Sequence, residues 1–196
     1  MSQVLEKSRK EQIQETAETL FKERGYPATS MRILASELGI EPASLYSHIK
    51  NKEEILAATC FRMANEFFSA VENFKNSDLS NSEKLKHYII AHMNVLLENL
   101  NASAVFFHDW KFMTEPNLSN FKELRKDYEN EFKAVLQAGI RTNEFRIDDI
   151  NFTSQTLFSA MNMTHEWYKP NGKMQGVQIG EKLADLLLNG ISNQKN

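Results

Sequence analysis

Helical spacing of the apolar residues is the feature that most constrains the fold of this chain. Only 4 Pro and 7 Gly interrupt its 196 residues. Between these breakers, apolar residues recur mainly three or four positions apart, which is the spacing of one face of an α-helix. The pattern predicts an all-α protein of about nine helices, with the approximate ranges 7–24, 31–38, 41–49, 51–74, 80–100, 102–113, 117–138, 148–168 and 177–189.

The short second and third predicted helices have the spacing of a helix-turn-helix. Small Ala35 lets two helix backbones approach, and Gly39 tolerates the positive φ that a turn of three or four residues needs. Leu45 and Ile49 lie four residues apart, so they share the inward face of the third helix. The other residues of that helix therefore point outward.

These outward residues are small or polar, so the third helix can enter the major groove of DNA. Four positions are expected near base edges: Pro42, Ala43, Ser44 and Ser47. Contacts to phosphate are expected from Tyr46, His48, Lys52 and, at the start of the second helix, Thr29, Ser30 and Arg32. The predicted division is a DNA-binding domain, residues 1–51, and a helical body for effector binding and dimerisation, residues 52–196.

Charge does not by itself indicate DNA. The formal net charge is −3, which argues against a general binder of polyanions. Residues 1–52 hold eight Lys and Arg against seven Asp and Glu, and the remainder holds 15 against 19. A contact with DNA must therefore depend on the local arrangement of the head.

The stretch ETLFKERGYPATSMRILASELGIEPASLYSHIKNKEEIL resembles the N-terminal DNA-binding domain of the tetracycline-repressor (TetR) family of bacterial regulators. The shared features are F-x-x-x-G-Y, L-A-x-x-x-G-I and L-Y-x-H-I-x-N-K, which ends at Lys52. Two conservative departures are Leu34 before Ala35, where the family more often has Ile, and Met31, where Thr or Val is frequent. The resemblance implies a dimeric transcriptional regulator, usually a repressor that a small ligand releases from its operator.

Aromatic and flexible apolar residues are concentrated in the body. Twelve of the 13 Phe, both Trp and six of the 8 Met follow Lys52, which is compatible with a pocket that adapts to an apolar ligand and equally with an ordinary helical core. The segments that begin at FFHDW and at LFSAMNMTHEWYKPNG are similar to the C-terminal domain of TetR regulators of fatty-acid, phenylacetate and sterol degradation, several of which respond to acyl-CoA. The resemblance suggests as effector-binding residues Phe106, Phe107, Trp110, Met113, Phe158, Met161 and Trp167. Trp167 fits a packing anchor between helices as well. Candidate cations for a CoA phosphate are Arg125, Lys126, Arg141, Lys169 and Lys173.

Broad apolar faces on the last two predicted helices indicate a homodimer in which two helices from each subunit pack around a two-fold axis. The expected interface residues are Ile150, Leu157, Ile179, Leu183, Leu186 and Leu187. Such a dimer would read a pseudo-palindromic operator with half-sites about one helical turn, roughly 34 Å, apart or a multiple of it. An effector between body helices could tilt the fourth helix and change the separation of the two heads.

Enzymatic chemistry has little support in the sequence. The five His form no metal-binding or catalytic motif, Cys60 has no Cys or His nearby, and no phosphate-binding loop occurs. We therefore expect no metal, no cofactor and no enzyme. The N-terminus lacks a signal sequence and no apolar run reaches the roughly 18 residues of a membrane span, which predicts a cytoplasmic protein without a membrane partner. Two alternatives remain: a TetR-type regulator of efflux that senses drug-like hydrophobic molecules, and an all-α enzyme or partner-binding protein with a vestigial helix-turn-helix.

Overall fold

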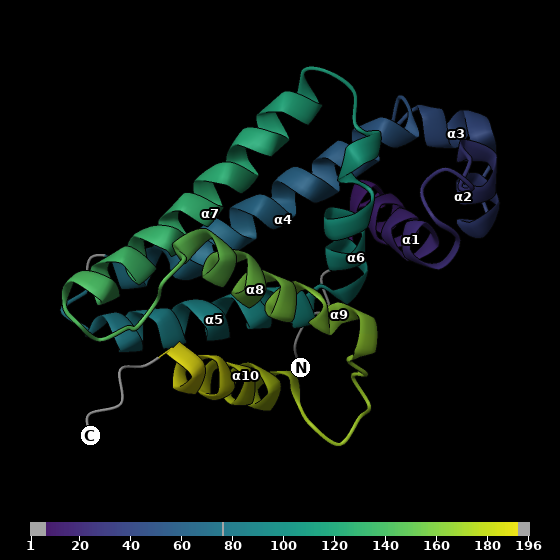
Figure 1. Cartoon of the computed structure of the whole chain (residues 1–196). Coiled ribbons are helices and arrows are strands. Elements are labelled where there is room, and N and C mark those ends of the chain that lie inside the picture. Colours follow the sequence, from purple (N-terminus) through teal and green to yellow (C-terminus); the bar gives the residue numbers. More distant parts are fainter. Residues whose placement is uncertain (1–6, 76, 192–196) are drawn as a thin grey trace. The chain divides into compact units, whose positions relative to one another are not determined.

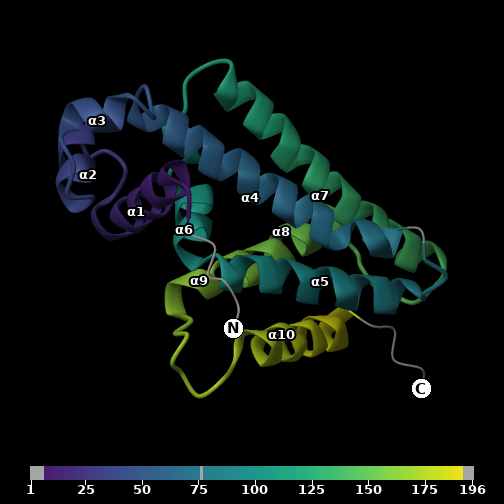
Figure 2. The ribbon, with the colours of Figure 1, turned by 180° about the vertical axis from the view of Figure 1, so that it is seen from behind.

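The computed structural model describes residues 7–75 and 77–191, and within these ranges the chain is helical without a β-strand (Figures 1 and 2). The predicted all-α class is confirmed. The elements in chain order are α1 (Arg9–Arg24), α2 (Met31–Glu37), α3 (Pro42–Tyr46), α4 (Lys52–Lys75), α5 (Asn81–Glu98), α6 (Leu100–His108), the short 3-10 helix η1 (Trp110–Phe112), α7 (Asn117–Arg141), α8 (Ile150–Asn162), α9 (Thr164–Trp167) and α10 (Gly176–Ile191).

The chain forms two compact units. Among the described residues, the head unit consists of 7–63 and 101–121, and the body unit of 64–75, 77–100 and 122–191. Helices α4 and α7 contribute to both units because each continues past a unit boundary. The segment 101–121, which the sequence-based division places in the body, therefore packs with the helix-turn-helix.

The head unit has the predicted apolar core and, in addition, a buried charge. The apolar face of α1 is buried through Ile13, Ala17, Leu20 and Phe21. On the same helix Glu18 is only 5% exposed, and its carboxylate accepts hydrogen bonds of 2.9 Å from Arg62 and from the Thr59 hydroxyl. A buried carboxylate is costly unless it is paired and hydrogen-bonded. These bonds therefore join α1 to α4 at a defined register.

Side-chain caps fix where several helices begin. Ser80 and Glu83 form the predicted capping box at the start of α5. Ser8 and Glu11 form another at the start of α1, which begins at Arg9, two residues later than the predicted start at Lys7. At the start of α4, the Asn51 side-chain oxygen accepts the backbone N–H three residues on, at 2.9 Å. Each cap satisfies a backbone donor that the helix itself leaves unpaired.

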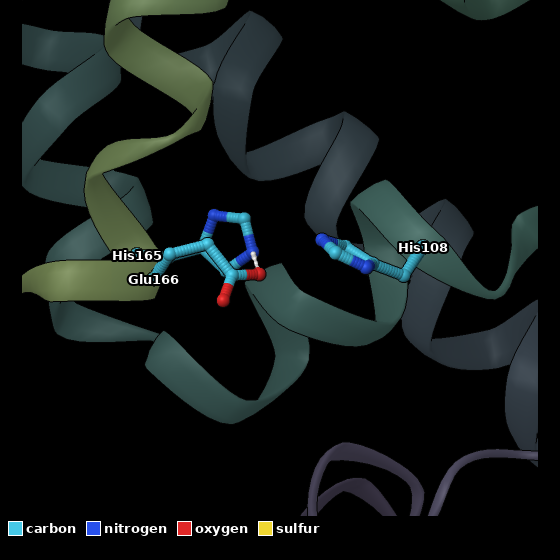
Figure 3. A group of neighbouring side chains, drawn as sticks. All are labelled: His108, His165 and Glu166. Carbon is cyan, nitrogen blue, oxygen red and sulfur yellow. Dashed lines mark ion pairs between the residues drawn. The ribbon is translucent and has the colours of Figure 1, made fainter.

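The predicted helix over 148–168 is two helices in the structure. The His165 ring hydrogen-bonds the backbone carbonyl of Asn162. In a continuous α-helix that carbonyl would accept the N–H of Glu166, which instead bonds the carbonyl of Met163 at 3.2 Å. Competition from the imidazole therefore accounts for the end of α8. The His165 ring also pairs with the Glu166 carboxylate at 3.1 Å, as Figure 3 shows.

The third helix is shorter than the predicted 41–49 for a similar reason. The Ser47 hydroxyl donates to the backbone carbonyl of Ser44 at 2.7 Å, so the N–H of His48 bonds the carbonyl of Leu45 rather than that of Ser44. Local hydroxyl-to-backbone bonds of this kind compete with helix propagation. The recognition segment is thus a short α-helix followed by one tight turn.

The body unit is organised around α5, which packs against α10 in both views (Figures 1 and 2). Close approach of the two helices depends on Gly180, because a Cβ at this position would lie 3.3 Å from the Cβ of Met93. At the edge of the contact, Lys86 and Asp185 form a surface ion pair of 2.7 Å. Such exposed pairs add little stability, so apolar packing holds α10 in place.

One carboxylate joins the start of α5 to the loop after α7. Glu144 accepts backbone N–H bonds from Asn81 and Ser82, at 3.2 and 2.8 Å, and a bond of 2.8 Å from the Thr142 hydroxyl. Burial alone would raise the pKa of Glu144, but these hydrogen bonds lower it to about 2. The carboxylate therefore stays ionised and keeps the loop closed at neutral pH.

Gly139 on α7 provides a sharp test of packing in the body unit. A Cβ at this position would lie 2.1 Å from the Phe145 ring, whose side chain is buried. We expect Gly139→Ala to lower the free energy of unfolding by about 1 to 3 kcal/mol, as overpacking of a filled core does. Urea denaturation followed by circular dichroism measures the change.

The matched control is Gly190→Ala on α10, where nothing lies within 4 Å of the added carbon. Its expected effect is neutral or slightly stabilising, because alanine is the better helix former. Equal stability of the two variants would contradict the packing of Phe145 against α7.

Candidate nucleic-acid interface and effector core

Helices α2 and α3 form the predicted helix-turn-helix. Leu34, Ala35 and Leu45 are at most 1% exposed, so they fill the space between the two helices and α1. Gly39 has φ +64° and open space around its Cα, which confirms that the turn needs a residue tolerant of this conformation. The inward half of the motif is therefore as the sequence predicts.

The outward half of α3 is open to solvent. The exposed side chains are Ala43, Ser44, Tyr46, Ser47 and His48, and Pro42 is half-buried in the first turn. Tyr46 is 53% exposed although it is a large aromatic residue. A short helix with small and polar groups on its free face can approach base edges closely, and a phenolic hydroxyl beside it can donate to phosphate.

Ser30 and Thr29, at the start of α2, were both expected to contact phosphate, but their environments differ in the structure. Ser30 is the N-cap, accepting the N–H of Ile33 at 3.2 Å, and stays exposed together with Arg32. Thr29 is only 1% exposed, and its hydroxyl donates to the carbonyls of Leu20 and Gly25. The Thr29 hydroxyl therefore closes the turn after α1 and is not exposed for the phosphate contact expected from the sequence.

Lys52 is also used inside the head unit. Its ammonium donates to the backbone carbonyls of Tyr26, Pro27 and Thr29 at 2.9, 3.4 and 3.2 Å, and lies 4.2 Å from the centroid of the Tyr26 ring. An ammonium has three donors and no acceptor, so all of its donors are occupied. Lys52 thus holds the turn before α2 against the start of α4. Nearby, the side chains of Arg32 and Lys50 are exposed.

The turn held by Lys52 is also joined to η1. Tyr26 stacks on Phe112 with ring centroids 5.5 Å apart, and burial, followed by the charges of Glu53 and Asp109, raises the pKa of Tyr26 to about 12. Asp109 accepts the backbone N–H of Tyr26, while burial raises the pKa of that carboxyl. These contacts make residues 109–112 part of the same block as the helix-turn-helix.

Glu53 extends this connection at the first turn of α4. Its carboxylate accepts both the backbone N–H and the hydroxyl of Thr114 at 3.0 Å. The backbone hydrogen bond from Thr114 is the main reason that the pKa of Glu53 is lowered. The segment after η1 is therefore hydrogen-bonded directly to the first turn of α4.

The seven residues suggested for effector binding fall in two units. Phe106, Phe107, Trp110 and Met113 belong to the head unit, and Phe158, Met161 and Trp167 to the body unit. In the head unit, the centroid of the Phe106 ring lies 5.0 Å from that of Phe107 and 5.2 Å from that of Phe121. In the body unit Met161 is buried, whereas Trp167 is 55% exposed and so is not a packing anchor within the chain.

A buried polar chain lies in the aromatic core of the body unit, and the sequence analysis missed it. His92 is 2% exposed. Its Nδ1 lies 3.1 Å from the Tyr128 hydroxyl and its Nε2 lies 3.0 Å from the side-chain oxygen of Asn162. Phe67 stacks on the imidazole with ring centroids 4.5 Å apart, and Phe158 contacts it edge-on. Desolvation by burial lowers the pKa of His92 to about 4.

The exposed apolar surface lies on and around the last three helices. Leu157 and Ile179 are 3% and 5% exposed, so they are already covered within the protomer and offer little surface for the interface expected from the sequence. Leu186 is 70% exposed, and the half-buried members of the predicted set are Ile150, Leu183 and Leu187. Further exposed apolar side chains on these elements, which the prediction omitted, are Phe152, Met163, Trp167 and Val177.

The fold and the head define a helix-turn-helix protein with an all-helical body. Residues 13–59 match the family described as bacterial regulatory proteins, tetR family, and residues 78–191 match the tetracyclin repressor-like C-terminal domain. The chain belongs to the TetR family. Among the helices that the structure describes, none has the length and apolar composition of a membrane span.

Relatives within this family extend along nearly the whole chain. The HTH-type transcriptional repressor KstR2 of Mycolicibacterium smegmatis is 27% identical over 191 residues, covering 96% of this chain and 93% of the relative. The fatty acid metabolism regulator protein of Bacillus subtilis is 24% identical over 185 residues, covering 93% and 95%. Both relatives are named as regulators.

Two solved structures support the fold. The ketosteroid transcriptional regulator KstR2 of Mycobacterium tuberculosis superposes with a TM-score of 0.90 at 24% identity, covering 95% of this chain and 96% of that one. AibR, solved in complex with isovaleryl coenzyme A and operator DNA, superposes with a TM-score of 0.80 at 22% identity, covering 94% and 98%. At these identities, the two structures establish a shared fold.

Proposed function

We propose that this protein is a ligand-responsive transcriptional repressor that binds a pseudo-palindromic DNA operator as a homodimer. The observation that carries the proposal is α3, whose outward face presents only small or polar residues and one exposed tyrosine over a packed helix-turn-helix core. A face of this kind suits direct readout in the major groove. In this account residues 1–51 bind DNA, and residues 52–196 bind the effector and dimerise.

The candidate DNA contacts of the head then divide into three groups. Base edges are read by Pro42, Ala43, Ser44 and Ser47. Phosphates are contacted by Ser30, Arg32, Tyr46, His48 and Lys50. Thr29 and Lys52 act indirectly because their polar atoms already bond to the turn before α2. Phosphate contacts set the orientation of the head and base contacts set the sequence that it prefers.

Dimerisation is assigned to the exposed apolar surface of the body unit, with Leu186 and Phe152 as its most exposed members at 70% and 69%. Large exposed apolar side chains on neighbouring elements indicate a protein contact. A two-fold axis between such surfaces would place two heads on half-sites about one helical turn apart. The apolar part of the interface is thus built from a subset of the predicted residues together with Phe152.

The effector is proposed to be an acyl-CoA or a related apolar carbonyl compound. Support comes from relatives named for fatty acid metabolism and ketosteroid regulation, and from a protein of the same fold that binds isovaleryl coenzyme A. Phe158 and Met161 on α8 are the predicted contacts that border the aromatic core of the body unit. Release of DNA on binding would follow if the effector favours a different placement of α4.

Removal of the Ser44 hydroxyl tests the division of the head residues into base contacts and phosphate contacts. We expect Ser44→Ala to change the preferred base at one or two operator positions by about 1 to 3 kcal/mol each, with the salt dependence of affinity unchanged. Competition binding on operators with single base changes measures this. A uniform loss on every sequence would show that Ser44 contacts phosphate instead.

Selection of bound duplexes from a random library tests the function as a whole. The expected result is a pseudo-palindrome, followed by its release when an acyl-CoA is added. Release only by drug-like hydrophobic molecules would favour a regulator of efflux. Failure to enrich any duplex would overturn the proposed function.

A further inference from the structure

The buried chain of Tyr128, His92 and Asn162 is unusual for the core of a helical domain. An imidazole surrounded by Phe67, Phe158 and Tyr128 gives less stability than a Phe or Leu of similar volume would, because its polar atoms lose water. All three polar side chains lie in the body unit, on α5, α7 and α8. Both ring nitrogens of His92 have hydrogen-bond partners, which offset the lost water and orient the three polar side chains.

The hydrogen-bond directions follow from the chemistry of each atom. The side-chain oxygen of Asn162 can only accept, so Nε2 of His92 carries the proton and donates to it. His92 is neutral at pH 7 because its pKa is about 4. Its Nδ1 is then an acceptor, and the Tyr128 hydroxyl donates to it. The chain thus fixes which face of the Asn162 carboxamide points inward.

The carboxamide nitrogen of Asn162, at the end of this series of hydrogen bonds, has no partner among the residues that the structure describes. The Asn162 carboxamide nitrogen makes no hydrogen bond to any described residue, whereas its oxygen is held by His92. Asn162 is half-buried and is the last residue of α8, and its backbone carbonyl is held by His165. The side chain and the backbone of Asn162 are therefore both held, and the carboxamide keeps an oriented N–H group on the helix that also carries Phe158 and Met161.

We infer that the Asn162 carboxamide is the hydrogen-bond donor to the thioester carbonyl of an acyl-CoA effector, and that Tyr128 and His92 hold it in the donating orientation. The inference rests on the proposed function and names the polar contact that discriminates among apolar ligands. A neutral amide beside a neutral imidazole offers a dipole and no positive charge. A carboxylate would have to lose its water here without a cation to pair with, which is costly, whereas an uncharged carbonyl needs only one donor. The site therefore suits the thioester better than the carboxylate of a free fatty acid.

Matched pairs of ligands isolate this contact. The probes are butyryl-, octanoyl- and palmitoyl-CoA, each compared with the thioether of the same chain length, in which a methylene replaces the carbonyl. Isothermal titration calorimetry gives a Kd for each member. For at least one chain length, the wild type is expected to bind the thioester about tenfold more tightly than the thioether, the worth of one hydrogen bond.

Substitution of the donor should remove this preference. Asn162→Leu is expected to bring the thioester-to-thioether ratio near one while the affinity for the thioether changes little. Tyr128→Phe is a milder second variant: without a donor at Nδ1, the imidazole can change tautomer and the carboxamide can turn its oxygen outward, so the ratio should fall here too. Asn151→Leu, at an exposed Asn on the same helix, is the matched control and should keep the wild-type ratio.

Operator binding by each variant, measured without ligand, shows that it is folded and separates this inference from the proposed function. A folded Asn162→Leu protein that keeps the tenfold preference would overturn the assignment of the donor. A wild type that binds operator but shows no preference for thioesters, or binds none of the probes, would overturn the inference and leave the DNA-binding function standing. A wild type that binds no operator would overturn the proposed function instead.

Discussion

Replacing Lys52 by methionine is expected to weaken operator binding by about tenfold while the slope of log affinity against log salt stays the same. The ammonium of Lys52 donates to three backbone carbonyls of the turn before α2. Its loss would loosen the turn that positions Ser30 and the start of α2. A tenfold change in affinity corresponds to about 1.4 kcal/mol. The loss of a hydrogen bond to a charged group costs a free energy of this size.

The salt slope separates this positioning role from a phosphate contact. Each phosphate that a protein neutralises contributes about −0.9 to the slope, so a lysine that directly contacts phosphate must change the slope when it is removed. Fluorescence anisotropy with a labelled operator at several salt concentrations measures both quantities. A slope reduced by about one for Lys52→Met would restore the expectation, drawn from the sequence alone, that Lys52 is a phosphate contact.

Lys50→Met is the matched control because it makes the same chemical change at an exposed lysine two residues away. For this variant the slope itself should fall by about one. Thermal unfolding adds an independent readout. Lys52→Met is expected to lower the melting temperature, whereas Lys50→Met is expected to leave it nearly unchanged.

A second large effect is expected from Leu186→Glu on α10. Leu186 is 70% exposed in the isolated chain, and the proposed dimer buries it. A carboxylate in an apolar interface is strongly unfavourable without a partner. Analytical ultracentrifugation should therefore find a monomer, and specific operator affinity should fall by about 100-fold or more because two half-sites are no longer bound together.

Asn189→Glu adds the same charge to an exposed position of the same helix and controls for charge alone. This variant should remain a dimer with operator affinity near that of the wild type. The interface assignment would be contradicted by a Leu186→Glu protein that sediments as a dimer and binds operator normally.

The elements that depend on neighbouring residues could be predicted from the sequence. The helix-turn-helix is specified within about 20 residues by Ala35, Gly39 and the inward leucines, and the capping box of Ser80 and Glu83 lies within one helical turn. Helix ends were less predictable. The end of α8 depends on a side chain, His165, that competes for a backbone carbonyl.

Contacts between distant parts of the chain could not be read in this way. Lys52 bonds to a carbonyl 26 residues earlier, and His92 bonds to Tyr128 and Asn162, which lie 36 and 70 residues later. A sequence pattern shows that Lys52 is charged and that His92 lies on a helix, but not which partners the fold supplies. Lys52 therefore resembled a phosphate contact, and His92 carried no signal at all.

The spacing of apolar residues in the body unit also could not show which of them face the protomer's own core and which face a partner. The pattern on the last helices identified broad apolar faces, yet it could not divide them between the protomer's own core and a partner. Ile179 is buried within the chain, whereas Leu186 is exposed. The two residues differ because only part of the α10 surface is covered by α5.

Native mass spectrometry of the protein on its selected operator, with increasing octanoyl-CoA, tests the central claim most directly. The account predicts one duplex bound by two chains, and loss of that species as complexes of two chains with bound thioester appear. A protein that never forms a two-chain complex with any selected duplex would contradict it. So would a complex that binds the ligand fully and still retains the DNA after titration with every acyl-CoA tested.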